Sequence, residues 1–334
     1  MKGSIAVIGA GMAGMTAAQM LRASGHRVEV FERESILGGR LATRRIDRMN
    51  YDLGTPYITA RTREFDRHLN GLALTGAISR WAPALYEGQR TDGRVVTPQN
   101  WFVGIPGMNS ITRAMSEGLR IHLASPVRRL TRVSTGTGPR WALEFANGDL
   151  SEGFHAVLST APAPETYALM RDHTQEFDEI TRVRMSPCWT VVVHLPTRLP
   201  VAFDAASQIG EILAWVARDT SKPSRRKESE IWILQSTPDW SKEFVEEEPD
   251  LVAEDLWREF QTAFPQVADH SPTSVSAYRW RYALVERSLA SSALFSREHL
   301  LGAAGDWCLG PRAEAAFESA HALVRRVDDA FATR

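Results

Sequence analysis

Apolar positions near the start of the chain predict a strand, a helix and a second strand in succession. Residues 4–8 form a short apolar, β-branched run that is typical of a buried strand. The stretch 15–24 (MTAAQMLRAS) consists of strong helix formers and ends before Gly25. A second strand is expected at 26–32 (HRVEVFE), where Val28, Val30 and Phe31 are apolar, and it ends on Glu32. This succession predicts a βαβ unit at the N-terminus.

Three glycines separate the first strand from the helix, in the order Gly9-x-Gly11-x-x-Gly14. In this context Gly9 permits a tight turn, Gly11 lets a pyrophosphate approach the backbone, and Gly14 allows the helix to pack closely on the strand. A carboxylate such as Glu32, about 20 residues further on, accepts hydrogen bonds from an adenosine ribose. The alternative, a glycine-rich turn without a ligand, explains the glycines but not the terminal acid. The glycines also argue against a signal peptide, because they interrupt the apolar run.

The next part of the chain predicts a helix over 61–82, an aromatic-rich hairpin over 81–102, and a helix after Ser110. Short strands are expected at 119–123, 127–133, 141–146 and 156–160, separated by turn signals such as Asn147-Gly148. The strand at 156–160 is followed by Ala-Pro-Ala-Pro, which predicts an exit from the sheet without a helix. We place a domain crossing there.

Long alternating strands rich in tryptophan dominate the region 165–285, and they predict a mostly antiparallel sheet. A helix is expected near 249–264, and the charged stretch 221–230 is interpreted as a solvated connection. The C-terminal part predicts another short strand that ends in Gly305-Asp306, then a helix over 311–332. This strand and helix are expected to return to the first domain.

Composition limits the functional class. The chain of 334 residues has 43% hydrophobic and 24% charged residues, which is typical of a globular protein. A net charge of −1 gives no electrostatic footprint for nucleic acid, and no apolar run is long enough for a membrane span. The two cysteines are too few to predict a disulfide framework. The nine histidines are not spaced as metal ligands are, so no metal site is predicted. A cytoplasmic location is the default expectation.

These motifs together resemble the flavin-binding folds of the amine oxidase and glutathione reductase superfamily. The resemblance rests on the glycine fingerprint with Glu32, on Gly38-Gly39-Arg40, on Asp52-x-Gly54, and on Gly305-Asp306 before the last helix. It implies non-covalent FAD, with Arg40 at the pyrophosphate, Val127 near the adenine and Asp306 at the ribityl chain. The expected cofactor-binding residues are Gly9, Gly11, Met12, Ala13, Gly14, Glu32, Arg33, Gly39, Arg40, Asp52, Gly54, Val127, Gly305, Asp306, Arg312 and Ala315.

The chain is also similar to the bacterial branch of the renalase family. That resemblance is carried by GGRLATRR (38–45), DLGTPYITAR (52–61), WFVGIPGMNSITRAM (101–115), DTSKPSR (219–225) and GDWCLGPRAEAAFESA (305–320). It implies oxidation of isomeric dihydronicotinamides, the 2- and 6-dihydro forms of NAD(P), by hydride transfer to flavin N5 with reduction of O2 to hydrogen peroxide.

Monoamine oxidases carry a lysine near flavin N5, whereas the corresponding stretch here, 186–189, has none. Hydride transfer requires few catalytic side chains, because the cofactor supplies the chemistry. We therefore expect an aromatic and apolar substrate pocket without certain catalytic side chains. The candidates are Tyr57, Arg61, Trp101, Met108, Trp189, Arg281 and Tyr282.

The expected fold is an α/β Rossmann-like FAD-binding domain (1–60, 104–162 and 285–334) with a discontinuous α+β substrate domain (61–103 and 163–284). Two other hypotheses of enzymatic function stay open, an amine or polyamine oxidase and a carotenoid-type desaturase. A flavin-binding sensor without turnover is the alternative of another class. Expected partners are a small-molecule substrate and O2, and the sequence is compatible with a monomer and with a homodimer.

Overall fold

The computed structural model describes residues 2–46, 49–88, 93–136 and 138–333. Each of its two compact units is built from separate stretches of the chain. Unit 1 comprises Met1–Gly39, Thr112–Met185 and Val285–Arg334, and unit 2 comprises Arg40–Ile111 and Ser186–Leu284.

Unit 1 has the architecture of a dinucleotide-binding domain. Its elements are β1 (Ser4–Ile8), α1 (Met12–Ala23), β2 (Arg27–Phe31), α3 (Ser110–Met115, which starts in unit 2), β9 (Arg120–His122), β10 (Val127–Thr135), β11 (Gly138–Phe145), β12 (Leu150–Phe154), β13 (Ala156–Ser159), α4 (Ala163–Met170), the 3-10 helix η2 (Gln175–Arg182), β19 (Leu294–Ser296), β20 (Leu301–Ala303), η5 (Asp306–Cys308) and α7 (Ala313–Ala332).

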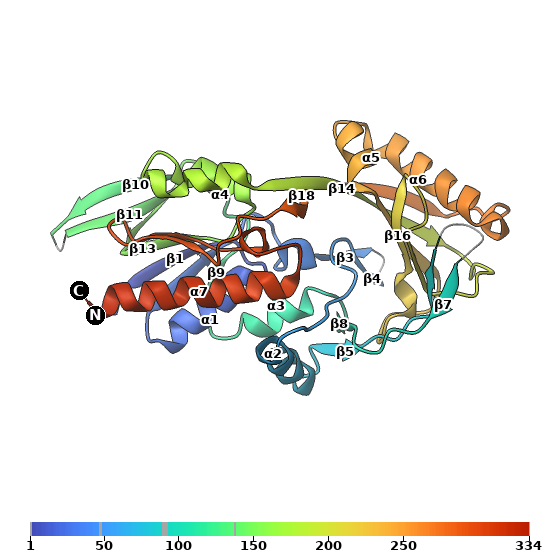
Figure 1. The fold of residues 1–334 in the computed structure, drawn as a ribbon, viewed down its shortest axis with the longest axis horizontal. Helices are drawn as coiled ribbons and strands as arrows, with labels where there is room; N and C mark the ends of the chain where they lie inside the picture. Colours follow the sequence, from blue (N-terminus) through green and yellow to red (C-terminus); the bar gives the residue numbers. More distant parts are fainter. Residues whose placement is uncertain (1, 47–48, 89–92, 137, 334) are drawn as a thin grey trace. The chain divides into compact units, whose positions relative to one another are not determined.

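A six-stranded sheet in the order β19-β20-β13-β1-β2-β9 forms the centre of unit 1. All neighbours pair in parallel except β19, which is antiparallel to β20. Strands β1 and β13 are buried along their whole length, as expected for a parallel sheet that is covered on both faces. Helices α1 and α7 lie side by side on one face, and α4 with the β10–β11–β12 sheet lies on the other (Figure 1).

Unit 2 is dominated by strands. Its elements are η1 (Gly39–Leu41, which starts in unit 1), β3 (Thr43–Ile46), β4 (Met49–Asp52), α2 (Arg63–Leu74), β5 (Ile78–Arg80), β6 (Leu85–Glu87), β7 (Arg94–Val96), β8 (Phe102–Gly104), β14 (Arg184–Leu195), β15 (Ala205–Ser207), β16 (Leu213–Arg218), η3 (Asp219–Ser221), β17 (Glu230–Ser236), α5 (Pro238–Glu243), α6 (Pro249–Ala263), η4 (Pro265–Val267) and β18 (Ser274–Arg287). Strands β14 and β18 extend a few residues into unit 1.

The main sheet of unit 2 has seven strands in the order β18-β14-β17-β16-β15-β6-β7. The pairs β14–β17, β16–β17 and β15–β16 are antiparallel, whereas β15 and β6 pair in parallel. The apolar face of α6 packs on this sheet, where Leu256 and Phe260 meet Trp232 and Leu234 in one core. Two short antiparallel pairs, β3–β4 and β5–β8, complete the unit.

The structure confirms the expected fold class and corrects several elements. The helix expected over 61–82 ends at Leu74, because Thr75-Gly76 turns the chain into β5. The exit without a helix after residue 160 is wrong, since Pro162 is the N-cap of α4. The unit boundaries also differ from the expected domain limits. Residues 40–60 and 104–111 group with unit 2, and residues 163–185 with unit 1.

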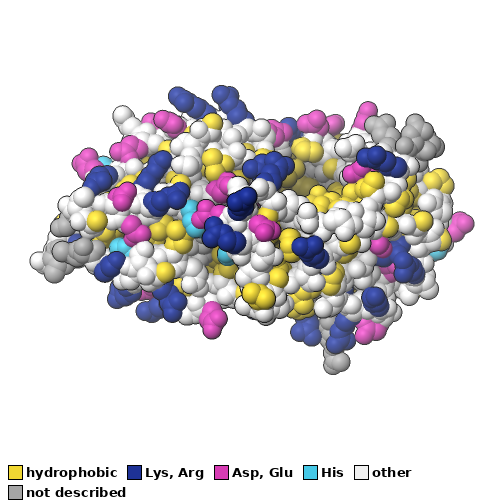
Figure 2. All heavy atoms as spheres, turned by 60° about the horizontal axis from the view of Figure 1, so that its bottom comes forward, with side chains coloured by type: hydrophobic (Ala, Val, Ile, Leu, Met, Phe, Trp, Pro, Cys, Tyr) yellow, Lys and Arg dark blue, Asp and Glu magenta, His cyan; other side chains and the backbone are white. Residues whose placement is uncertain are grey.

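On the face drawn in Figure 2, Lys and Arg side chains alternate with Asp and Glu side chains, and no extended area of one sign is visible. This mixture agrees with the net charge of −1. Across the described ranges, no helix combines the length and the apolar character that crossing a bilayer requires.

Candidate functional site

The turn after β1 is shaped by its glycines. Gly9 has φ 101°, a conformation that favours glycine. A Cβ on Gly14 would lie 1.9 Å from the Gly9 carbonyl oxygen, so only glycine lets α1 pack against the turn. A Cβ on Gly11 would meet nothing closer than 3.7 Å. The turn therefore keeps open space above Gly11, where the sequence predicts a pyrophosphate.

The first turn of α1 offers its N–H groups to a ligand. Its N-cap is Gly11, which has no side chain to cap the helix, and the first turn contains no acidic residue. Free N–H groups and the positive end of the helix dipole together attract phosphate. Gly38 lies against the same turn, since its N–H donates to the Ala10 carbonyl over 3.2 Å.

Glu32 follows β2 directly and holds the glycine turn. One of its carboxylate oxygens accepts the Ala10 N–H at 2.7 Å, and the other accepts the Glu34 N–H at 2.9 Å. Burial raises the pKa of Glu32 despite these backbone hydrogen bonds. Its role at a ribose stays a prediction. The neighbouring Arg33 pairs with Glu165 at 2.8 Å, on the exposed side of unit 1.

A second glycine motif follows β20, which is separated from β1 by β13 alone. A Cβ on Gly305 would lie 2.5 Å from the indole nitrogen of Trp307, so a side chain there would displace that ring. The Gly305 N–H donates to the Ser319 hydroxyl at 3.1 Å, which ties the motif to α7. Asp306 is 4% exposed. Because β1 and β20 are both parallel to β13, the two glycine motifs follow the same edge of the sheet.

Arg312 is the N-cap residue of α7. Its Nε atom is buried and has no hydrogen-bond partner among the residues that the structure describes. A buried donor without an acceptor is costly, and a bound anionic group would satisfy it. With the space above Gly11 and the uncapped α1, this donor shows that the residues present fit a dinucleotide.

Unit 1 contains most of the expected cofactor-binding residues, and unit 2 contains the others. Those in unit 1 are Gly9, Gly11, Met12, Ala13, Gly14, Glu32, Arg33, Gly39, Val127, Gly305, Asp306, Arg312 and Ala315, whereas Arg40, Asp52 and Gly54 lie in unit 2. Arg40 donates from its guanidinium to the Ala283 carbonyl at 3.0 Å. A Cβ on Gly54 would lie 2.1 Å from the Arg40 carbonyl oxygen, so Gly54 serves a close backbone approach.

The Asp52 carboxylate is fully engaged by protein groups. One oxygen accepts the Thr43 hydroxyl at 2.7 Å and the Met108 N–H at 2.8 Å. The other pairs with Lys222 Nζ at 2.7 Å and with Arg225 Nη2 at 2.6 Å. Burial would raise the pKa of Asp52, but the two cations lower it to about 2. Asp52 is thus held by protein groups in unit 2, and its expected role at the cofactor stays a prediction.

The stretch 221–230 is only partly the solvated connection that its composition predicts, because residues 226–228 are exposed but two of its cations are buried. Lys222 is 2% exposed and Arg225 is 6% exposed. Both cations also pair with Asp219, at 2.7 Å for Lys222 and 3.3 Å for Arg225. Two acids and two bases balance their charges inside unit 2, which makes the burial possible. We refer to Asp52, Asp219, Lys222 and Arg225 as the ion cluster.

An aromatic group in unit 2 includes two of the expected substrate residues. The rings of Tyr57 and Trp101 stack with centroids 3.6 Å apart and planes inclined by 6°. Trp215 lies 5.7 Å from Tyr57 and 5.9 Å from Trp101, and Trp81 lies 5.8 Å from Trp101. Burial raises the pKa of Tyr57, with a smaller contribution from Glu87. Sequence reasoning missed Trp215, whose position in an alternating strand gives no sign of the stack. We call these four residues the aromatic group.

The other expected substrate residues differ in environment. Met108 and Trp189 are fully buried. Met108 accepts the Gly104 N–H at its sulfur, and Trp189 donates from its indole to the Phe244 carbonyl, so both are packing residues. Arg281 makes a two-pronged ion pair with Glu246 at 2.5 and 2.8 Å. Tyr282 on β18 is half-buried, and Arg61 before α2 is exposed.

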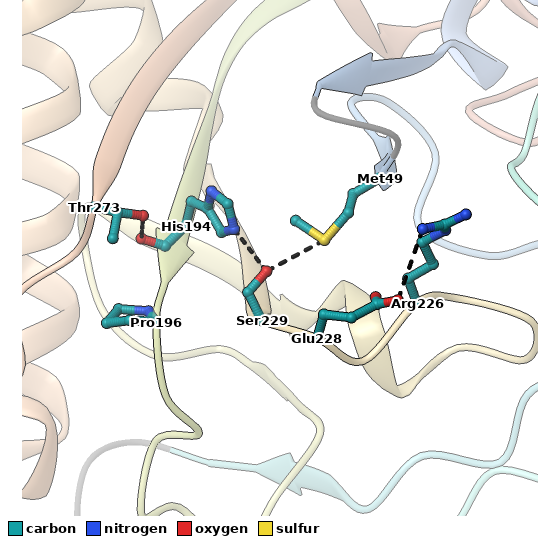
Figure 3. Close-up of a pocket in the computed structure, with 7 residues that line it drawn as sticks. All are labelled: Met49, His194, Pro196, Arg226, Glu228, Ser229 and Thr273. Atoms are coloured by element: carbon teal, nitrogen blue, oxygen red, sulfur yellow. Dashed lines mark hydrogen bonds and ion pairs between the residues drawn. The ribbon is translucent and has the colours of Figure 1, made fainter.

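A separate cavity of about 380 Å³ opens in unit 2 beside β14. Figure 3 shows His194, Ser229 and Met49 converging on it, with the Ser229 hydroxyl 2.6 Å from His194 Nε2 and 3.2 Å from the Met49 sulfur. No residue of the aromatic group lines this cavity, and neither does any expected substrate residue. In the described part of the chain, no three metal-ligating side chains converge.

Comparison with known sequences identifies two overlapping regions. Residues 7–71 match the NAD(P)-binding Rossmann-like domain, and residues 60–304 match the flavin containing amine oxidoreductases. Local similarity extends to a 4,4'-diapophytoene desaturase of Staphylococcus haemolyticus, 44% identical over 50 residues, which are 15% of this chain and 10% of that protein. The small chain of a glutamate synthase of Mycobacterium tuberculosis is 38% identical over 73 residues, which are 22% of this chain and 13% of that one. These matches span only a small part of each relative.

Solved structures share the fold over almost the full length. A protein assigned as a protoporphyrinogen oxidase from Exiguobacterium sp. 255-15 superposes with a TM-score of 0.77 at 14% identity, covering 98% of this chain and 99% of the other. A cofactor-binding variant of putrescine oxidase gives a TM-score of 0.71 at 10% identity and covers both chains completely. The match over residues 60–304 covers more than half of the sequence. The chain therefore belongs to the family of flavin containing amine oxidoreductases, and its cofactor is FAD.

Proposed function

We propose that the chain is an FAD-dependent oxidase of isomeric dihydronicotinamide dinucleotides, the 2- and 6-dihydro forms of NAD(P). The substrate loses a hydride and leaves as NAD(P)+. O2 then takes up the two electrons and the proton of that hydride, together with one proton from solvent, and becomes hydrogen peroxide. FAD supplies the hydride acceptor, its N5 atom. The observation that carries the proposal is the parallel stack of Tyr57 on Trp101.

The aromatic group suits a planar ring as ligand. Tyr57 and Trp101 are half-buried, so part of the stack is available to a ligand, while the buried Trp81 and Trp215 rings pack against it. A nicotinamide stacks on such rings, and this contact orients the donor carbon without an acid–base pair. The similarity to the renalase family in DLGTPYITAR (52–61) and WFVGIPGMNSITRAM (101–115) supports the same substrate class, because these two segments contain Tyr57 and Trp101.

The ion cluster makes an amine substrate less favourable. Lys222 is the buried lysine of unit 2, and its ammonium group is held by two carboxylates. It is therefore not available as a base or as a water-holding amine. Family membership and the shared fold of putrescine oxidase nevertheless keep amine oxidation as the second candidate.

Product analysis in air tests the proposal. We expect purified holoenzyme to convert 2-dihydro- or 6-dihydro-NAD(P) into NAD(P)+ and hydrogen peroxide in equal amounts. The ordinary 4-dihydro form and a panel containing putrescine, spermidine and benzylamine should give background peroxide. Peroxide formation from an amine, with none from the dihydronicotinamide isomers, would establish the second candidate in place of the first.

Replacing Trp101 tests the stack itself. Trp101→Ala removes the face on which the nicotinamide would stack, a contact worth roughly 1–3 kcal/mol, so we expect KM to rise by about 10- to 100-fold. Trp101→Phe retains an aromatic face and should stay within about threefold of the wild type, and Tyr57→Phe, which loses only a hydroxyl, should do the same. Steady-state kinetics with the preferred isomer provide the measurement. An unchanged KM in Trp101→Ala would remove the stack from the substrate site.

A further inference from the structure

The segment DTSKPSR (219–225) connects the ion cluster to the aromatic group. Lys222 Nζ lies 5.6 Å from the centroid of the Trp81 ring, a cation–π distance. The preceding residue, Ser221, accepts the indole N–H of Trp81 at 3.2 Å. Two neighbouring side chains of this segment therefore hold one ring, which is itself 3% exposed.

Trp81 contacts the stack through both its backbone and its ring. Its backbone N–H donates to the Trp101 carbonyl at 2.9 Å, and its ring lies 5.8 Å from the Trp101 ring. Trp101 in turn stacks on Tyr57. A shift of the buried Trp81 ring would therefore change the packing against Trp101.

The ion cluster also fixes the backbone on both sides of the stack. Arg225 donates to the Gly104 carbonyl at 3.2 Å, three residues after Trp101. Asp52 accepts the Met108 N–H and lies five residues before Tyr57. The two chain segments that supply the stacked rings are thus attached to the same four charges.

We propose that Lys222 and Ser221 are positioning residues that set the geometry of the Tyr57–Trp101 stack through the Trp81 ring, and thereby the affinity for the substrate ring. The inference rests on the proposed function for the identity of that ring. Neither residue is assigned a contact with substrate or cofactor. Their effect should appear in KM and leave kcat nearly unchanged.

Two conservative variants test this with the ion cluster intact. Ser221→Ala removes the acceptor of the Trp81 N–H, and Trp81→Phe removes the donor while keeping an aromatic ring. Each should raise KM for the preferred isomer by about 3- to 10-fold with kcat within about twofold of the wild type. The double variant should match either single variant, because both act through the same hydrogen bond. Unchanged KM values in both single variants would overturn the proposal.

Lys222 is tested with a variant pair and a control from the same segment. Lys222→Met should raise KM more than Ser221→Ala does, and Lys222→Arg, which keeps a cation over the ring, should recover part of the loss. The exposed Lys227 supplies the control, Lys227→Met, which should behave as the wild type. Equal KM values for Lys222→Met and Lys227→Met would overturn the role of Lys222. If Lys222→Met does not fold, the Ser221 and Trp81 variants decide.

A spectroscopic readout separates this inference from the proposed function. The near-ultraviolet circular dichroism of the holoenzyme reports the packing of the indole and phenol rings, whatever the substrate is. We expect the aromatic bands of Ser221→Ala and Lys222→Arg to differ from those of the wild type at unchanged FAD content. The bands of Lys227→Met should equal those of the wild type. If the wild type oxidises no dihydronicotinamide, the proposed function fails, while these band changes would still support the positioning role. Identical spectra in all variants would contradict it.

Discussion

Gly11→Val is expected to abolish high-affinity FAD binding while leaving the protein folded. Gly11 has φ −83°, which any residue adopts, and a Cβ there meets nothing closer than 3.7 Å. The added side chain would instead occupy the space predicted for the pyrophosphate, so we expect the dissociation constant for FAD to rise by roughly 100-fold or more. Flavin absorbance after gel filtration and titration of the apoprotein with FAD provide the measurement.

Two other glycines provide the controls for this substitution. Gly14→Ala places a Cβ 1.9 Å from the Gly9 carbonyl oxygen, so it should lower the thermal midpoint as well as the flavin content. Gly71 in α2 has open space around it, and Gly71→Ala should keep full flavin content with a stability gain of about 0.5–1 kcal/mol. Full flavin content in Gly11→Val would show that the turn does not hold the cofactor.

Asp52→Asn is expected to be the most destabilising single substitution of a charged residue in unit 2. The neutral amide leaves Lys222 and Arg225 with one carboxylate between them in a dry environment. Breaking a buried ion pair in this way costs about 3–5 kcal/mol. Urea unfolding of the holoenzyme at neutral pH, followed by circular dichroism, measures the loss. The matched control is Asp255→Asn, which removes an exposed pair with Arg258 and should cost less than about 1 kcal/mol.

The pH dependence of this loss checks its cause. The pKa of Asp52 is lowered to about 2 in the folded protein, against about 3.9 for a free aspartate. The stability contributed by its ionised form is therefore fully present above about pH 4 and is lost as the pH falls toward 2. We expect the difference between wild type and Asp52→Asn to shrink over this range. A difference that stays constant down to pH 2 would assign the loss to hydrogen bonding alone.

Local sequence signals predict most of the helices and strands at the two ends of the chain in unit 1. The strand, glycine turn and helix of residues 4–23 are adjacent in the chain, so their periodicity and turn residues predict the structure directly. The same holds for the strand before Gly305 and for α7. The sequence does not predict helix α4, because its prolines indicate a break in regular structure. Pro162 and Pro164 instead occupy positions at the start of the helix, where the missing N–H has no cost.

Long-range pairing explains what the sequence did not reveal in unit 2. Lys222 and Asp52 are 170 residues apart, so no local pattern shows that Lys222 is buried against this carboxylate. Trp81 and Ser221 are likewise 140 residues apart, so local patterns do not show that they form a hydrogen bond. The sequence places Trp189 among the candidates for the substrate pocket, because the alternating pattern of a strand does not distinguish a core tryptophan from one that lines a pocket. Its indole is buried in the sheet core instead.

Anaerobic rapid mixing of the holoenzyme with single substrates tests the central claim most directly. The account predicts that 2-dihydro- or 6-dihydro-NAD(P) bleaches the flavin absorbance within a single turnover, and that amines and 4-dihydro-NAD(P) leave it unchanged. Bleaching by an amine, with no response to either dihydronicotinamide isomer, would contradict it.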